Sequence, residues 1–382
     1  MSESKYVEDL ALAHLLADIA DSISLDRYQS LDLVITTKPD NTPVTDADRA
    51  VETAIREALA THRPNDGLLG EEFGSDITGA KRYWVIDPID GTKNFMRGVP
   101  MWATLIALVE VADDGTQEVV VGIASSPALA HLLADIADSI SLDRYQSLDL
   151  VITTKPDNTP VTDADRAVET AIREALATHR PNDGLLGEEF GSDITGAKRY
   201  WVIDPIDGTK NFMRGVPTWA TLIALVEVAE DGTQEVVVGI ASSPALARRW
   251  YASCCEGAYV TFNGQSRKLA VSQVSSITDA SVAYSDFVGF GSRLNAFNSI
   301  LSTAWRTRGM GDFWSHMLVA EGAVDIAIEP TLAVWDMAAL DIIVREAGGV
   351  FTNTSGEHGP FGGSGVSTNK AVHKALIKAL NA

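Results

Sequence analysis

Two stretches of the chain repeat the same order of apolar and polar positions, first at 11–130 and again at 128–247. Each opens with apolar residues at helical spacing, as in ALAHLLADIADSI at 128–140. The segment TPVTDADRAVETAIREALATH then predicts an amphipathic helix that Thr162 or Asp163 caps. The pattern therefore predicts two successive helices in each stretch.

Short apolar runs follow these helices. LLGEEF and YWVIDPID are typical of short buried strands that end in acidic residues. Two β-rich runs flank Asp231-Gly232 and predict a hairpin. After residue 248, the segment RRWYASCCEGAYVTFNGQ predicts a further strand pair.

The rest of the chain alternates between helical and strand patterns. A helix is expected at Phe313–Glu321, followed by a strand that reaches Glu329, and a second helix at Val334–Gly349. The strand GVFTN and a helix at Asn369–Leu380 complete the chain. This alternation predicts an α/β fold.

The repeat is a duplication, because 11–130 and 128–247 differ at only two positions, Met101 against Thr218 and Asp113 against Glu230. Removing one 117-residue copy, His14–Ala130, leaves 265 residues, the size of an ordinary enzyme domain. We therefore expect an extra N-terminal half at 1–127 and a complete domain at 128–382. That domain would combine 128–247 with 248–382.

Composition favours a soluble globular protein. The chain is 46% apolar, and no segment approaches the roughly 20 consecutive apolar residues of a membrane helix. The N-terminus carries acids where a secretory signal carries positive charge, so the cytoplasm is the expected compartment. The net charge of −22 argues against a nucleic-acid partner, because such proteins present basic stripes. Cys254 and Cys255 are adjacent, a poor geometry for a structural disulfide.

The segment WVIDPIDGTKNF occurs in both copies and carries the clearest chemistry. Asp204 and Asp207 end an expected strand, so both carboxylates can enter one cleft, where they repel each other unless a cation is shared. Gly208 and Thr209 then open an expected helix, whose free N–H groups suit a phosphate. A single acid at a helix start is more often a cap, which is the commoner explanation for Asp163 when it is taken alone.

Further oxygen ligands come from distant segments. Glu188 stands in LLGEE, Asp163 in TPVTD, and Asp336 in VWDMAALD, which occurs only once. Oxygen donors of this kind suit Mg²⁺ or Mn²⁺, whereas zinc sites use His and Cys. The sequence therefore predicts a divalent-metal site that handles a phosphate ester.

The segments GEE, WVIDPIDGTKNF and VWDMAALDIIVREAGG together resemble the three signature segments of the inositol monophosphatase family of Mg²⁺-dependent phosphatases. The resemblance covers the 265 residues and implies a layered αβαβα sandwich of the inositol monophosphatase and fructose bisphosphatase type. It also implies a homodimer that hydrolyses a small phosphate ester.

The resemblance assigns roles to individual residues. Metal ligands would be Glu188, Asp204, the carbonyl of Ile206, Asp207 and Asp336. Thr209 with Asp163 would activate the attacking water, and the amides of Gly208 and Thr209 would hold phosphate. The counterparts in the first copy are Asp46, Glu71, Asp87, Ile89, Asp90, Gly91 and Thr92.

Within the family, the stretch Gly311–Pro330 resembles actinobacterial-type histidinol-phosphate phosphatases more than inositol phosphatases. We expect Asp312 and Glu329 to recognise the ammonium group of L-histidinol phosphate, because carboxylates pair well with a cationic amine. The alternative for Asp312 is a cap on the helix that follows it. Hydrolysis of inositol 1-phosphate or a related sugar phosphate is the alternative activity.

The duplication leaves open which half completes the site. The second copy continues directly into residues 248–251, so we expect it to do so, with the first copy left exposing a sheet edge and an apolar face. The rival arrangement docks the first copy and extrudes the second. A third hypothesis, of another class, is an inactive oligomer in which orphan halves are swapped between chains.

Overall fold

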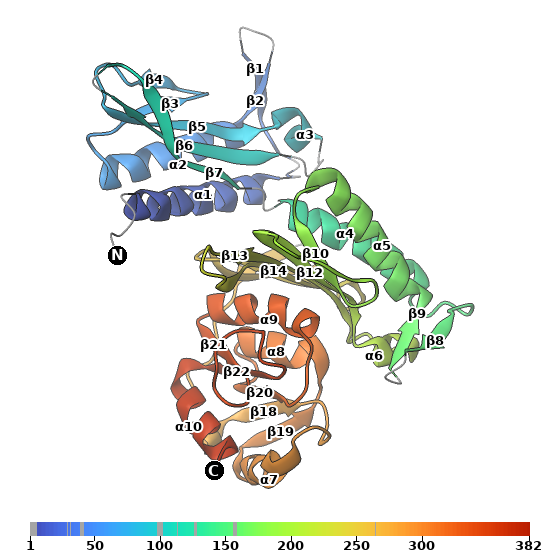
Figure 1. Cartoon of the computed structure of the whole chain (residues 1–382). Coiled ribbons are helices and arrows are strands. Elements are labelled where there is room, and N and C mark those ends of the chain that lie inside the picture. Colours follow the sequence, from blue (N-terminus) through green and yellow to red (C-terminus); the bar gives the residue numbers. More distant parts are fainter. Residues whose placement is uncertain are drawn as a thin grey trace. The chain divides into compact units, whose positions relative to one another are not determined.

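The computed structural model describes residues 6–28, 30, 32–38, 42–97, 102–112, 114–125, 128–155, 159–263 and 265–382. The chain forms two compact units, unit 1 (Met1–Leu132) and unit 2 (Leu133–Ala382), which Figure 1 colours from blue to red along the sequence. Helix α4 (Ala128–Arg144) runs across the division between them. The expected boundary between residues 127 and 128 therefore lies at the start of α4.

Unit 1 is a five-stranded sheet with two helices. The sheet has the order β4-β3-β5-β6-β7, in which only β3 and β5 run parallel among the described strands. Helix α1 contacts β6, β7 and α2, and α2 contacts β5, so both helices cover the same sheet. The elements are α1 (Val7–Arg27), β1 (Ile35–Thr37), β2 (Pro43–Thr45), α2 (Asp46–His62), β3 (Gly67–Gly70), β4 (Gly74–Asp76), β5 (Arg82–Asp90), α3 (Thr92–Met96), β6 (Ala103–Val111) and β7 (Gln117–Ser125).

Unit 2 repeats these elements and then extends the sheet. Its first sheet has eight strands in the order β11-β10-β12-β13-β14-β15-β16-β17. The strands β15 to β17 lie in the part of the sequence that is not duplicated. After α4, the elements are β8 (Ile152–Thr154), β9 (Pro160–Thr162), α5 (Asp163–His179), β10 (Gly184–Gly187), β11 (Gly191–Asp193), β12 (Arg199–Asp207), α6 (Thr209–Met213), β13 (Ala220–Val228), β14 (Gln234–Ser243), β15 (Arg248–Ser253), β16 (Gly257–Phe262) and β17 (Gln265–Lys268).

The C-terminal part of unit 2 adds a second sheet. Its five strands have the order β19-β18-β20-β22-β21, with β18 parallel to both β19 and β20. The elements are β18 (Ser281–Tyr284), α7 (Leu294–Thr303), β19 (Arg306–Gly309), α8 (Asp312–Ala320), β20 (Ile326–Glu329), α9 (Val334–Glu346), β21 (Gly349–Thr352), β22 (Gly365–Asn369) and α10 (Lys370–Leu380).

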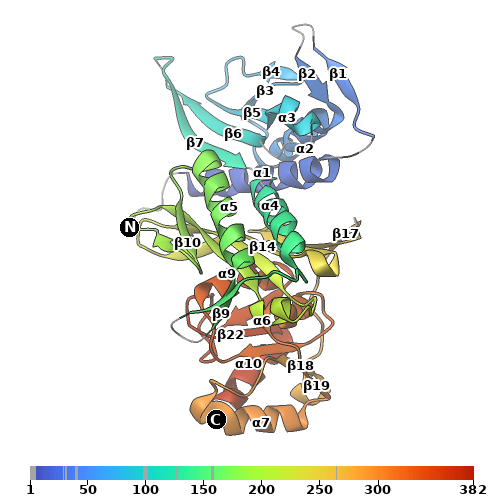
Figure 2. The same cartoon turned by 90° about the vertical axis from the view of Figure 1, so that its right-hand side faces the viewer.

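Unit 2 is layered, as Figure 2 shows. Helix α5 lies on β12 of the first sheet, whereas α9 contacts that sheet from β12 to β16 and also contacts β21 and β22 of the second. Helix α10 contacts β21 and β22 and packs with α7. The order is helices, sheet, helices, sheet, helices, so the expected α/β fold, a layered αβαβα sandwich, is confirmed.

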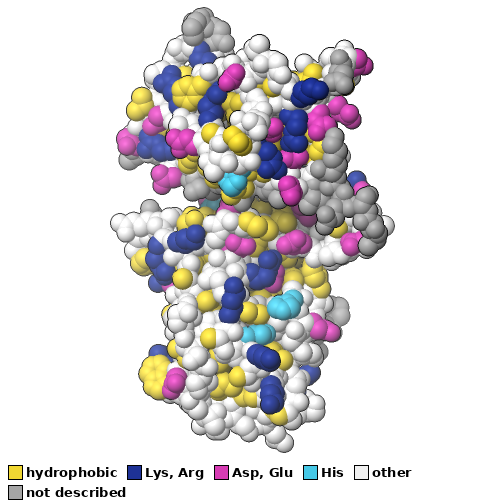
Figure 3. Space-filling view, turned by 90° about the vertical axis from the view of Figure 1, so that its left-hand side faces the viewer, with side chains coloured by type: hydrophobic (Ala, Val, Ile, Leu, Met, Phe, Trp, Pro, Cys, Tyr) yellow, Lys and Arg dark blue, Asp and Glu magenta, His cyan; other side chains and the backbone are white. Residues whose placement is uncertain are grey.

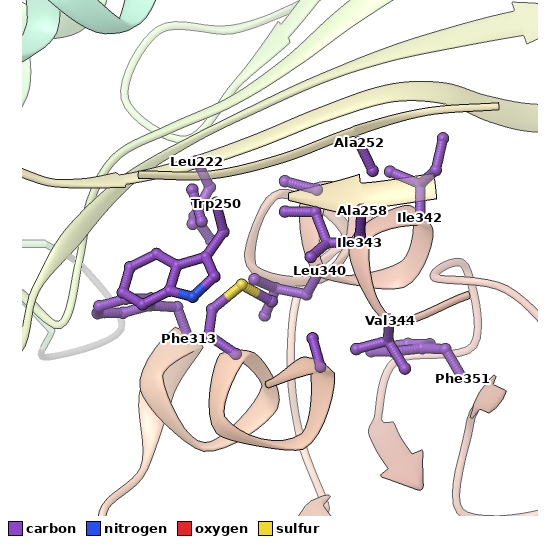
Figure 4. Packing of buried hydrophobic residues seen from close by; sticks show 14 of the residues in the cluster. Leu222, Trp250, Ala252, Ala258, Phe313, Leu340, Ile342, Ile343, Val344 and Phe351 are labelled. Carbon is purple, nitrogen blue, oxygen red and sulfur yellow. The ribbon is translucent and has the colours of Figure 1, made fainter. Parts of the chain in front are cut away.

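The main apolar core lies where α8 and α9 meet the first sheet (Figure 4). Trp250 of β15 is fully buried and contacts Phe313 of α8 with ring centroids 5.8 Å apart. Leu340 and Ile343 of α9 belong to the same cluster. Burying side chains of this size stabilises a fold by about 1.5–3 kcal/mol each. This packing fixes the start of α9, which carries Asp336, beside the end of β12.

The surface mixes charges of both signs. On the face in Figure 3, Lys and Arg side chains are interspersed with Asp and Glu. Among the described helices, none combines the length and the apolar character that crossing a bilayer requires.

Candidate active site

Three carboxylates from separate segments meet in unit 2. Asp204, Asp207 and Asp336 each offer an oxygen, and these oxygens lie within 4.8 Å of one another. Asp204 and Asp207 stand on either side of a break in the pairing of β12 with β13. Such a bulge re-aims side chains, and Pro205 within it has no N–H to donate to the ladder. Asp336 arrives from the first turn of α9, where its carboxylate accepts a hydrogen bond from Ala333 N at 2.7 Å.

Burial makes this group electrostatically costly. Burial, followed by the charges of Glu188 and Asp207, raises the pKa of Asp204 well above its usual value. Burial and then the charges of Asp312 and Asp336 do the same to the pKa of Asp207. Burial raises the pKa of Asp336 to about 6. Carboxylates gathered in this way ionise together only when a cation neutralises them.

The donor set fits a hard divalent cation. All three side chains present oxygen, and neither His nor Cys belongs to the group. Glu188 lies close enough for its charge to raise the pKa of Asp204, but its Oε1 accepts a hydrogen bond from Lys155 Nζ at 2.8 Å. Lys155 therefore occupies one oxygen of the fourth carboxylate, a contact that sequence reasoning missed. The only sequence signal for this contact is the basic residue itself, Lys155, which directly follows β8.

The pairing of Thr209 with Asp163 was wrong, because the structure brings Asp165 to Thr209 instead. The Thr209 hydroxyl lies 3.3 Å from Asp165 Oδ1 and 3.0 Å from the carbonyl oxygen of Ile206. The Asp163 carboxylate turns away and forms an ion pair with Arg144 at 2.7 Å.

The local helix start explains this difference. Asp163 is the first residue of α5 and Asp165 the third, and Thr162 is the N-cap. The third position of a capping box turns its side chain back towards the cap. Asp165 Oδ2 accordingly accepts hydrogen bonds from Thr162 N at 2.8 Å and from Thr162 Oγ1 at 2.5 Å. Burial raises the pKa of Asp165 to about 6.

Gly208 makes the turn between β12 and α6. Its φ is +83°, a left-handed conformation that favours glycine. A Cβ at this position would lie 3.0 Å from the carbonyl oxygen of Thr218 and 3.3 Å from Asp312 Oδ2. The turn therefore brings the Gly208-Thr209 backbone close to the start of α8.

Asp312 and Glu329 lie next to the acidic group and are linked through Ser285. Ser285 Oγ donates to Glu329 Oε1 at 2.6 Å and accepts from Asp312 N at 3.4 Å. Asp312 Oδ2 accepts from Asn211 Nδ2 at 3.0 Å, and the neighbouring Phe313 N donates to Asp207 at 2.6 Å. Sequence reasoning assigned no role to Ser285 or Asn211. Asn211 lies in the WVIDPIDGTKNF motif, whereas no local pattern marks Ser285.

The geometry of Asp312 does not match a simple cap. Asp312 is the first residue of α8 with φ +51°, and the N-cap Gly311 has no side chain to bond the helix. A non-glycine residue in this region is strained, and such strain is common at functional sites. Burial raises the pKa of Asp312, against the charge of Lys210, and burial raises the pKa of Glu329 to about 8. Both carboxyls therefore favour a cationic partner.

The first copy keeps several of these contacts but does not form the acidic group among its described residues. Burial and then Glu71 raise the pKa of Asp87 to about 7. Thr92 Oγ1 lies 3.2 Å from Asp48 Oδ1, the counterpart of the contact between Thr209 and Asp165. Asp46 forms an ion pair with Arg27 at 2.7 Å, as Asp163 does with Arg144. Asp90 is exposed, and the described residues of unit 1 form no three-carboxylate group. Ile89 and Gly91 complete the same turn.

Comparison with known proteins decides the family. The sequence model described as the inositol monophosphatase family matches twice, at residues 6–139 and 129–382. The chain belongs to the inositol monophosphatase family. The two matches are consistent with the tandem duplication.

Two curated relatives are especially similar. A histidinol-phosphatase of Streptomyces coelicolor is 53% identical over 259 residues, which are 66% of this chain and 96% of the relative. A histidinol-phosphatase of Mycobacterium tuberculosis is 53% identical over 258 residues, 66% of this chain and 97% of the relative. Among solved structures, an inositol monophosphatase from Zymomonas mobilis is 32% identical, with a TM-score of 0.58, and the match covers 67% of this chain and 97% of that one.

Proposed function

We propose that this member of the family is a Mg²⁺-dependent histidinol-phosphatase, which converts L-histidinol phosphate and water into L-histidinol and phosphate. Its family makes the chain a phosphoric monoester hydrolase. The observation that carries the substrate is a pair of acidic residues beside the acidic group, half-buried Asp312 and buried Glu329. Ser285 Oγ accepts a hydrogen bond from the backbone N of Asp312 and donates one to the carboxylate of Glu329. The relatives named histidinol-phosphatase support the same substrate.

The metal ligands in this proposal are Glu188, Asp204, Asp207, Asp336 and the carbonyl of Ile206. A bound Mg²⁺ or Mn²⁺ would lower the pKa of a water molecule and neutralise charge on the phosphate. Lys155 would have to release Glu188 before that carboxylate could join the set. This exchange replaces one cationic partner of Glu188 by another.

Asp165 and Thr209 hold the attacking water in this proposal. The Thr209 hydroxyl orients the water oxygen towards phosphorus, while the carboxylate of Asp165 takes the proton that the water releases. The new bond joins the water oxygen to phosphorus, and the ester bond from phosphorus to the histidinol oxygen breaks. The departing alkoxide takes up a proton to give the alcohol. The amides of Gly208 and Thr209 bind the phosphate oxygens.

Asp312 and Glu329 determine the substrate. A histidinol ammonium placed between them gains two carboxylate partners, and its charge lowers the cost of ionising Glu329, whose pKa is about 8 without it. An inositol hydroxyl offers no positive charge. We therefore expect these carboxyls to favour the amine over the polyol.

Phosphate release from histidinol phosphate and inositol 1-phosphate, measured with Mg²⁺ and again with EDTA, tests the proposal. We expect hydrolysis only with metal and a higher kcat/KM for histidinol phosphate. Glu329→Gln should raise the KM for histidinol phosphate and change the inositol phosphate reaction little. Faster hydrolysis of inositol phosphate by the parent chain would assign the alternative activity.

A further inference from the structure

One face of the sheet in unit 1 is partly exposed, whereas the matching face in unit 2 is buried. We define the open face of unit 1 as Val85, Leu105, Ala107, Val119 and Gly122. Val119 is 63% exposed, whereas its counterpart Val236 in unit 2 is 1% exposed. The other apolar members are partly buried in unit 1 and almost fully buried in unit 2, where their counterparts are Val202, Leu222 and Ala224. Sequence does not cause this difference, because the paired residues are identical.

The missing side chain of one glycine leaves a gap in each sheet face, which we call the notch, and in unit 2 this gap holds helix α9. In unit 2, a Cβ on Gly239 would lie 2.5 Å from Ile342 Cγ2 and 2.7 Å from the carbonyl oxygen of Ala339, both on α9. Helix α9 therefore packs directly against the backbone of β14. In unit 1, a Cβ on the counterpart Gly122 would meet none of the described residues within 4 Å. The notch for α9 is present and open.

The strand edge gives a second, independent sign. In unit 2, β14 pairs with β15 along six residues, from Val238 with Ser253 to Ser243 with Arg248. In unit 1, β7 ends the sheet order of the described strands. An unpaired edge presents backbone donors and acceptors that a further strand can satisfy. The edge and the notch match two elements of the same segment, β15 and α9.

We infer that the open face of unit 1 docks the segment Arg248–Ala382 of a second copy of this chain. The segment occurs once per chain, and copy two already holds it, so a segment for unit 1 has to come from another molecule. Docking would place Asp336 of one chain beside Asp87 and Asp90 of the other and complete a second phosphatase site. This last consequence rests on the proposed function.

Such an exchange replaces the packing on copy two by nearly equivalent packing on copy one, because the two faces are identical. What favours copy two is the short link at residues 244–247, which joins β14 directly to β15. A short linker gives an effective concentration in the millimolar range. At micromolar protein, the exchanged form should therefore be roughly a thousandth of the population. A mutation that impairs docking on copy two should make the exchanged form the main docked form.

Gly239→Leu impairs copy two at the notch, and Gly122→Leu is the matched control. Sedimentation velocity of the parent, both single variants and the double variant should be compared from about 1 to 100 μM. We expect Gly239→Leu to form a species of twice the parent's mass as concentration rises, and Gly122→Leu added to it to restore the parent's mass. Unchanged mass in Gly239→Leu, or a doubling that Gly122→Leu leaves in place, would overturn the inference.

Activity provides a second test. In the parent, activity should depend on Asp207 and not on Asp90, and Gly122→Leu should leave it within about twofold. On the Gly239→Leu background the dependence should reverse, with specific activity rising as the protein concentration rises. Activity that depends on Asp90 but not on concentration would place the docking within one chain and sink the second-copy assignment. If the parent hydrolyses no ester, the proposed function fails while sedimentation still decides the docking.

Discussion

The two copies of the N-terminal half differ at only two positions and share the same strand register, but only the second copy has one face of its sheet covered by the C-terminal half. In both, the strand with two aspartates pairs with the next strand through the same bulge, between Asp87 and Asp90 and between Asp204 and Asp207. Local sequence is therefore sufficient for the strands, their register and the bulge. Burial of the acidic residues depends on the C-terminal half, which only unit 2 contains.

The pKa values of the acidic residues depend on whether the C-terminal half covers them. The pKa of Asp87 rises to about 7, mainly through burial and Glu71, whereas the pKa of Asp204 rises well above its usual value with Asp336 among its causes. The C-terminal half thus adds both the low-dielectric surroundings and the third carboxylate. A half-copy holds most of the ligand residues but lacks the conditions that make a cation strongly favourable.

The largest expected difference between the copies concerns the acid beside the threonine. Asp165→Asn should lower kcat/KM by roughly 10²–10⁴-fold, because it removes the proposed proton acceptor. The matched change Asp48→Asn in unit 1 should leave kcat/KM within about twofold. Steady-state rates at saturating metal measure both. Equal losses in the two variants would mean that both copies serve the same site.

Asp165 also shows where sequence reasoning failed. The segment TDAD offers two acids, Asp163 and Asp165, and the family resemblance was carried over to the first of them. The capping box was visible in Thr162 followed three residues later by Asp165. An acid at this third position faces the cap, while the first faces solvent and, here, Arg144. The metal and phosphate residues near Asp204 and Asp207 required no such choice, because the strand end places them together.

The elements with strong periodicity were predicted well, and the weakly patterned ones were not. The helix expected at Val334–Gly349 is α9 (Val334–Glu346), and that expected at Phe313–Glu321 is α8 (Asp312–Ala320). The short strand β22 (Gly365–Asn369) was missed, because its sequence GVSTN is largely polar although every residue is buried. Its order beside β20 is a long-range pairing that no local pattern encodes.

The sheet face is covered in unit 2 and open in unit 1, so the same substitution at matched valines should change the stability of the two units by different amounts. Val236→Thr should cost about 1–3 kcal/mol, because it buries a hydroxyl among apolar side chains. Val119→Thr should change stability by less than about 0.5 kcal/mol, since that side chain is mostly exposed. Hydrogen exchange of β14 and β7 peptides, followed by mass spectrometry, reports each unit separately. A similar cost at both positions would show that the face of unit 1 is covered in solution.

Glu329 belongs to the half that was not duplicated, so its titration should affect unit 2 alone. Its folded-state pKa is about 8 against an ordinary 4.5, so the unfolded chain loses this proton first as pH rises. Stability should therefore fall between pH 4.5 and 8. Glu329→Gln should match the parent near pH 4.5 and exceed it by roughly 4 kcal/mol at pH 8. Urea midpoints of unit 2 at the two pH values measure this, and a constant difference would contradict it.

The smallest expected effect concerns an ion-pair cluster that the described residues of the first copy have and those of the second copy lack. Asp9 lies on α1 and accepts hydrogen bonds from Arg63 at 3.0 Å and from Arg82 at 2.8 Å. The position that corresponds to Asp9 in the second copy is Ser126, and burial and then Arg199 lower the pKa of Arg180, the counterpart of Arg63. Copy two has thus lost a carboxylate that compensated two guanidinium groups.

Asp9→Asn should make the first copy resemble the second in this respect. We expect it to destabilise unit 1 by about 1 kcal/mol, because the two arginines are only partly exposed and lose their charged acceptor. Faster hydrogen exchange should be confined to α1, α2 and β5, with unit 2 and its activity unchanged. Deleting His14–Ala130 tests the converse, since it places Asp9 on the helix of the remaining copy and should stabilise that domain by a similar amount. If the deletion leaves stability unchanged, the carboxylate does not account for the difference between the helices.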